Sequence, residues 1–238
     1  MEIEAPQQSG EKGWRIIFEV NLPLLFLIYL LLNVLDGILR DQFILTDALY
    51  YQTLGEAQDF ERIADWNQWR HDWGWSSYLA IPLGMFIRIF LAAMCLNIGS
   101  LFYGSKLPFG KFFRIATVAE GIFCLMVLFN TISFIVSHDG DAVDYSLNDI
   151  YLNHPASLLG LARVLFEGEA ISAYYLAVLQ AANLFEVFYL LSLALGMAAL
   201  FQFRFGRGLR FVLASYGIGL LMWVVTLMFL MVTLVKVK

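Results

Sequence analysis

Five long apolar runs are the feature of this sequence that most restricts its fold. An α-helix needs about 20 mostly apolar residues to cross a bilayer core of roughly 30 Å, and each run is long enough. The runs cover residues 16–38, 78–103, 115–136, 174–203 and 211–235. Because 60 % of all residues are hydrophobic and only 15 % are charged, an ordinary soluble domain is excluded. We therefore predict an all-α polytopic membrane protein, a five-helix transmembrane bundle with one or two interfacial helices on its outer side.

The five runs also predict the domain organisation. Residues 1–15 are expected to form a cytoplasmic N-terminal tail, and residues 16–238 a single transmembrane domain with outer connections at 39–77 and 137–173. The first run follows Lys12 and Arg15, as the apolar region of a signal peptide does. It is too long for such a region, and no small-residue cleavage site follows it, so we predict an uncleaved helix.

The basic residues predict the orientation, because Lys and Arg collect on the cytoplasmic side of short loops. Eight of the fifteen lie in the N-terminal tail and in the two short connections: Lys12, Arg15, Lys106, Lys111, Arg114, Arg204, Arg207 and Arg210. Six others are spread over longer segments on the opposite side. We expect a cytoplasmic N-terminus, an external C-terminus and, from the short loops, a bacterial cytoplasmic membrane.

The outer connections are acidic and rich in aromatic residues. Their thirteen Asp and Glu residues account for the net charge of −5 and argue against binding to nucleic acid, which needs a basic surface. In the first connection, aromatic rings recur near helical spacing and extend to the start of the second run: Phe60, Trp66, Trp69, Trp73 and Trp75. Two interpretations stay open, an interfacial helix anchored by tryptophans or a docking surface for a partner protein.

The second outer connection contains an apolar segment that is too short to span a bilayer. It covers residues 157–166 and follows Pro155, a residue type that suits the first turn of a helix. We predict a half-length helix there, either interfacial or re-entrant.

Few residues outside the apolar runs are candidates for binding a metal ion, and the two cysteines lie within the runs. Asp139, Asp141 and Asp144 are weak candidates for a hard-cation site, but they lack the spacing of an EF-hand loop, and a solvated acidic turn is the alternative. Cys95 and Cys124 fall inside the apolar runs, where small buried side chains are expected.

Enzymatic activity is not indicated by any pattern in the sequence. The three histidines, His71, His138 and His154, lie outside the runs, which excludes a pair of axial haem ligands within the bundle. Zinc-protease and phosphate-loop patterns are absent, and no Ser or Cys has a plausible base on a neighbouring run. We predict no catalysis by the chain itself, no metal and no cofactor, although we expect bound phospholipid.

Three charged residues lie deep within the runs, where charges are costly unless they are paired or hydrated. At about 1.5 Å per residue, Arg88 and Glu186 lie roughly 22 and 24 Å from the inner ends of their runs. Glu120 is closer to the inner end of its run, at a depth similar to that of Asn97, which lies at roughly 9 Å. We therefore predict a structural ion pair between Arg88 and Glu186, and a hydrogen bond between Glu120 and Asn97. The alternative is an ion or proton path through these groups.

The segment NLFEVFYLLSLALGM, from Asn183 to Met197, precedes a short basic turn and a last apolar run. In this it resembles bacterial members of the Yip1 family, and the resemblance covers residues 76–236. Five spans with a cytoplasmic N-terminus are similar to that family as well. The aspartate that the family usually has before Leu-Phe is Asn183 here, and the eukaryotic Tyr-Gly signatures and long N-terminal segment are missing. The resemblance implies a membrane-embedded scaffold or trafficking-type adaptor without a catalytic centre.

Together, these observations favour a non-catalytic membrane subunit or scaffold of a larger assembly. Its expected partners are the lipid bilayer and other membrane protein subunits, bound through the outer connections and the lipid-facing helices. One alternative is a small transporter or channel component that uses Arg88, Glu120 and Glu186, although no inverted repeat is evident. A second alternative is a lipid- or quinone-cradling subunit of a membrane enzyme.

Overall fold

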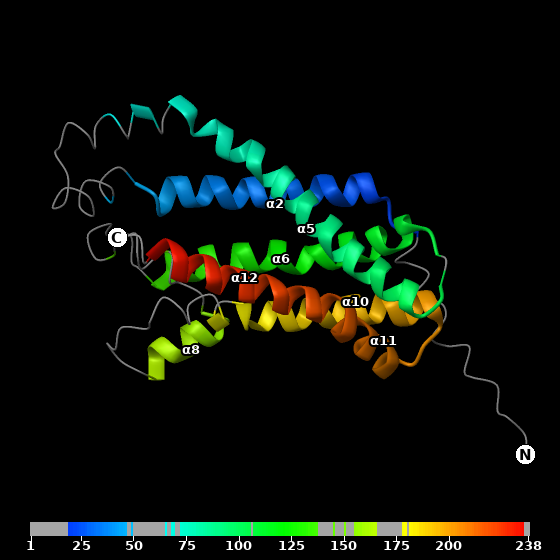
Figure 1. Ribbon diagram of the computed structural model, residues 1–238. Helices are drawn as coiled ribbons and strands as arrows, with labels where there is room; N and C mark the ends of the chain where they lie inside the picture. Colours follow the sequence, from blue (N-terminus) through cyan, green and yellow to red (C-terminus); the bar gives the residue numbers. More distant parts are fainter. Residues whose placement is uncertain are drawn as a thin grey trace, which may run out of the picture.

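The computed structural model describes residues 19–46, 49, 65, 68–69, 72–105, 107–137, 145, 150, 155–165, 178–179 and 181–235. Within them, the named elements are all helices: α2 (Leu22–Phe43), α5 (Trp75–Phe102), α6 (Phe109–Ser137), α8 (Leu158–Leu165), α10 (Leu184–Phe201), α11 (Phe205–Val212), the π-helical turn η1 (Leu213–Gly217) and α12 (Ile218–Val235). Five spans are long and apolar enough to cross a membrane, the last of them running from α11 into α12. Successive spans alternate in direction between the two ends of the bundle (Figure 1). The all-α, five-span prediction is confirmed.

The central helix of the bundle is α6. It packs against α2, α5 and α10. The core is built around it by fully or almost fully buried apolar side chains: Ile89 and Leu96 of α5, Phe112 and Ile115 of α6, and Leu193 and Met197 of α10.

The helix boundaries differ from the apolar runs because capping residues decide where a helix begins. The first span begins at Leu22, since the Asn21 side chain accepts a hydrogen bond from the Leu24 backbone N–H at 3.4 Å. The fourth begins at Leu184 rather than at residue 174. Asn183 has an extended backbone (φ −127°, ψ 160°), and its side chain accepts from the Glu186 N–H at 2.7 Å.

The predicted half-length helix in the second outer connection is confirmed as α8. Its beginning is joined to the beginning of α10 by two backbone hydrogen bonds, from Leu158 N–H to the Ala182 carbonyl and from Leu184 N–H to the Ala156 carbonyl, both at 2.9 Å. The two helices therefore start side by side, at the end of the bundle where α2 ends (Figure 1).

A small second core closes the outer end between α2 and α6. The Tyr145 ring packs edge-on against Phe134 of α6, with centroids 5.0 Å apart. Its hydroxyl donates to the Ile44 carbonyl at 3.0 Å. Burial raises the pKa of this hydroxyl, so it stays protonated as a donor.

Candidate functional site

Arg88 and Glu120 form an ion pair inside the bundle. Arg88 of α5 donates from Nε to Oε1 of Glu120 on α6 at 2.8 Å, and its Nη2 contacts the same oxygen. Glu120 is completely buried, while 40 % of the Arg88 side chain remains exposed. The guanidinium carbon also lies 4.4 Å from the centre of the Phe123 ring, in cation–π contact. The pair neutralises a carboxylate that would otherwise be very costly at this depth.

The predicted partner of Arg88 was wrong, because the structure pairs Arg88 with Glu120 and not with Glu186. For the same reason, Glu120 does not bind Asn97. Since α6 begins at Phe109 rather than at residue 115, Glu120 lies roughly 16 Å from the beginning of α6. Its depth in the bundle therefore differs from that of Arg88 by only about 5 Å. A long arginine side chain bridges that difference. Glu186 is at a matching depth, but its carboxylate accepts a hydrogen bond from Tyr216 instead.

Aromatic rings connect the ion pair to Glu186. The Phe123 ring packs on Tyr189 of α10 with centroids 4.6 Å apart, and Tyr189 packs on Tyr216 of η1 at 5.4 Å. The Tyr216 hydroxyl donates to Oε1 of Glu186 at 3.1 Å, and Glu186 is 9 % exposed. The Tyr189 hydroxyl is buried without a hydrogen-bond partner in the described part of the chain. Neither tyrosine was predicted to take part, because nothing in the local sequence distinguishes these two from other tyrosines in apolar runs.

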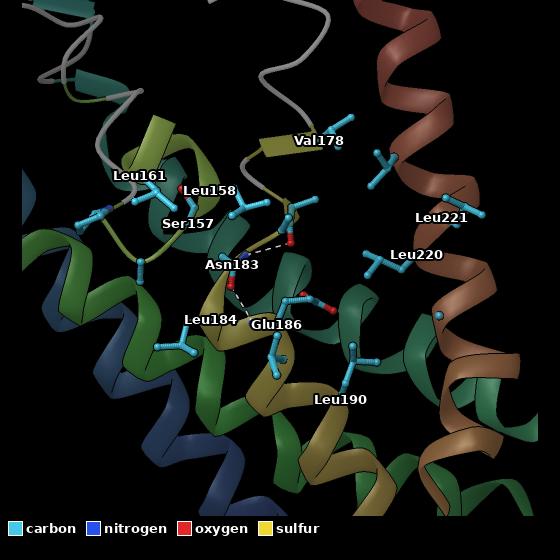
Figure 2. Close-up of a pocket in the computed structure, with 17 residues that line it drawn as sticks. Ser157, Leu158, Leu161, Val178, Asn183, Leu184, Glu186, Leu190, Leu220 and Leu221 are labelled. Carbon is cyan, nitrogen blue, oxygen red and sulfur yellow. Dashed lines mark hydrogen bonds between the residues drawn. The ribbon is translucent and has the colours of Figure 1, made fainter. Parts of the chain in front are cut away.

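A pocket of about 790 Å³ lies beside Glu186, between α8, α10 and α12 (Figure 2). The Glu186 carboxylate points from α10 toward α12 (Figure 2). Asn183 and Ser157 add polar groups where α10 and α8 begin, and most other lining side chains are apolar. An apolar wall with a few polar groups is the usual composition of a small-molecule site.

A second buried carboxylate, Asp36, lies in α2. Arg40 Nε is 3.0 Å from Oδ2 of Asp36 and donates to Oγ1 of Thr131 on α6, also at 3.0 Å. Asp36 is only 4 % exposed, and α2 continues beyond it to Phe43. The i, i+4 spacing of an acid and a base is the signal that would have identified this pair in the sequence.

The structure describes three of the aromatic residues that were predicted to be interfacial or to bind a partner. Trp69, Trp73 and Trp75 are each more than half exposed, and the Trp73 and Trp75 rings stack at 6.3 Å. Phe60 and Trp66 lie outside the described residues. Whether this surface anchors the chain in lipid or binds a partner stays a prediction.

The weak metal candidates Asp139, Asp141 and Asp144 also lie outside the described residues. Among the residues that the structure does describe, no three His, Cys, Asp or Glu side chains are grouped to hold a metal ion. Cys95 and Cys124 lie within spanning helices, and the Cys124 sulfur accepts a hydrogen bond from Asn33 at 3.2 Å.

Comparison of the chain with protein-family models, with curated proteins and with solved structures gave no match in any of the three. Its function is therefore inferred from the geometry of the bundle and the properties of its surfaces.

Proposed function

We propose that the chain is a non-catalytic integral membrane subunit or scaffold that assembles with another membrane protein. The last span carries this proposal. In the described bundle, α12 packs mainly on the η1 turn at its base. Only 11 % of the most apolar part of that span is buried within the chain, the same share as for the span of α2, compared with 39 % for the spans of α6 and α10.

The uncovered part of α12 presents large side chains that suit contact with another helix. Met222, Trp223 and Phe229 are 67 %, 58 % and 65 % exposed. Helix association in membranes depends largely on van der Waals contact between side chains. The exposed Trp73 and Trp75 add an aromatic surface at the outer end, of the kind that is enriched at protein interfaces. The resemblance to the Yip1 family supports the same role.

Purification of the tagged full chain in a mild detergent tests this proposal. We expect a second membrane protein in stoichiometric amount. A photo-crosslinking residue placed at Phe229 of α12 should capture it, while one at the equally exposed Leu101 of α5 should not. A lone monomer without crosslinks from α12 would contradict the proposal.

The same proposal places the chain in a bacterial cytoplasmic membrane with its N-terminus inside. Basic residues support this orientation, since Lys111, Arg114, Arg207 and Arg210 lie at or near the inner ends of their helices. Arg114 also donates to the Val20 carbonyl at 3.4 Å, so the first span begins at this end.

Two observations favour a small transporter or channel component as a second candidate. Arg88 is partly exposed within the span of α5, and Glu186 lines a pocket. Accessible charges at membrane depth are typical of ion and proton paths. Cation flux into vesicles that contain only the purified chain, lost in Glu186→Gln, would favour this candidate over a scaffold.

A further inference from the structure

The pocket beside Glu186 lies in the outer half of the bilayer. Glu186 is in the first turn of α10, roughly 22 Å from the inner end of that helix, within a hydrocarbon core of roughly 30 Å. In contrast, α6 continues outward beyond this level to Ser137 (Figure 1). The space beyond the first turn of α10 is therefore bounded by α8 and α12 rather than by a continued span.

The walls of the pocket are apolar and one side is open. Leu190 of α10 and Leu220, Leu221 and Val224 of α12 line it (Figure 2). Its volume of about 790 Å³ falls within the range of roughly 300–1,000 Å³ that is typical of small-molecule sites. An opening at this depth between apolar helices admits molecules from the bilayer more readily than from water.

No cation lines the pocket in the part of the chain that the structure describes. Its described lining contains no Lys or Arg, and the guanidinium of Arg88, whose charge acts on Glu186 from outside this lining, is bound to Glu120. Among the described residues, the Glu186 carboxylate accepts a hydrogen bond from a neutral hydroxyl, that of Tyr216. A carboxylate in an apolar site is strongly disfavoured unless a cation or proton accompanies it. A cationic group that donates hydrogen bonds is one complement to this carboxylate.

We propose that this pocket binds one membrane lipid whose head group carries a primary ammonium, as phosphatidylethanolamine does. The ammonium lies against the Glu186 carboxylate, Leu190 and Leu221 contact the first methylene groups, and the acyl chains leave through the open side into the bilayer. This proposal does not depend on the scaffold function, since a lone monomer would bind the lipid equally well.

Native mass spectrometry of the purified full chain tests the proposal with three lipids that have the same acyl chains. Phosphatidylethanolamine should form a single adduct at a concentration about tenfold lower than phosphatidylcholine, which lacks N–H donors, or phosphatidylglycerol, which lacks the cation. In Glu186→Gln, the preference among the three should fall to about twofold or less.

A matched pair of variants keeps the test valid even if Glu186→Gln fails to fold. Leu221→Trp fills the pocket and should abolish the lipid adduct. Met222→Trp changes the next residue, which is 67 % exposed and does not line the pocket, so this variant should still form the adduct. Circular dichroism and gel filtration confirm that both variants are folded.

Four results would overturn the proposal. Equal binding of the three lipids would remove the role of the ammonium, and equal effects of Leu221→Trp and Met222→Trp would remove the pocket. Displacement of phosphatidylethanolamine by free ethanolamine at equal concentration would show a site for soluble amines. A lipid-free dimer that Leu221→Trp dissociates would mean that a second copy of the chain occupies the pocket.

Discussion

The carboxylate of Glu120 depends on a single cation. Its Oε1 contacts both Nε and Nη2 of Arg88, whereas its Oε2 is buried with no hydrogen-bond partner among the described residues. Loss of one partner from a buried ion pair is far more costly than loss of both, because the remaining charge has no compensation. The two residues therefore behave as a unit, and their contribution is best measured with single and double variants.

Arg88→Leu should lower the free energy of unfolding by about 3 kcal/mol, because it leaves Glu120 charged and unpaired in the core. Addition of Glu120→Leu should restore most of this loss. Addition of Glu186→Leu should not, since Glu186 binds Tyr216 instead. Denaturant unfolding of the purified chain in mixed micelles, followed by circular dichroism, measures all three variants.

Asn97→Leu, on the same helix as Arg88, is the control for this series, and we expect it to leave the free energy of unfolding nearly unchanged. Glu186→Leu and Glu120→Leu could restore the stability of Arg88→Leu to the same extent. In that case the Arg88–Glu120 ion pair is incorrect, and the predicted pair of Arg88 with Glu186 is favoured again.

Among the helices, close approach depends on glycine at a few positions. A Cβ atom added to Gly208 of α11 would lie 2.5 Å from the Ala194 carbonyl oxygen of α10. One added to Gly99 of α5 would lie 2.5 Å from the Cβ of Ser215 in η1. A backbone oxygen has less freedom to move than a side chain, so the contact at Gly208 is the more restrictive of the two. Small residues commonly allow such contacts between membrane helices.

Gly208→Ala should therefore destabilise the bundle by about 1–3 kcal/mol, because α11 must move away from α10. Gly206→Ala is the matched control in the same helix, where an added Cβ meets nothing within 4 Å. It should be neutral, or stabilising by up to about 1 kcal/mol through its better helix propensity. Thermal unfolding in detergent compares the two, and equal melting temperatures would rule out a tight contact between α10 and α11.

For the whole molecule, the number of spans and the distribution of charge together predict the topology. The five spans alternate in direction, so the first span begins and the last span ends at opposite ends of the bundle (Figure 1). The basic residues of α11, Arg207 and Arg210, lie near the end at which α2 begins. By the preference of basic residues for the cytoplasmic side, the last span is expected to end outside.

Reporter fusions test this topology. Alkaline phosphatase fused after Lys238 should be active and a fluorescent protein at the same place dark, because the first matures only outside the cytoplasm and the second only within it. The fluorescent protein fused before Met1 serves as the control and should be bright. A bright C-terminal fusion would show an inverted chain or an even number of spans.

Much of the fold was predictable because it depends on local properties of the chain. Run length and apolarity identified the five spans, and Pro155 with its short apolar segment identified α8. Helix beginnings were less predictable, since a single capping side chain such as Asn183 outweighs the average apolarity of the residues before it. Arg88, Glu120 and Glu186 were recognised as important because a charge in an apolar run is visible without any structure.

The order and type of residues are sufficient to predict that the chain belongs in a membrane, that it has five spans and that Arg88, Glu120 and Glu186 lie within them. The packing of the helices, in contrast, decides that Arg88 pairs with Glu120, that Tyr216 binds Glu186 and that a pocket forms beside that carboxylate. Depth along a helix does not reveal which helices are neighbours or which way their side chains face. Arg88 of α5 pairs with Glu120 on the neighbouring helix α6, and a tyrosine from a π-helical turn takes the place of the expected arginine at Glu186.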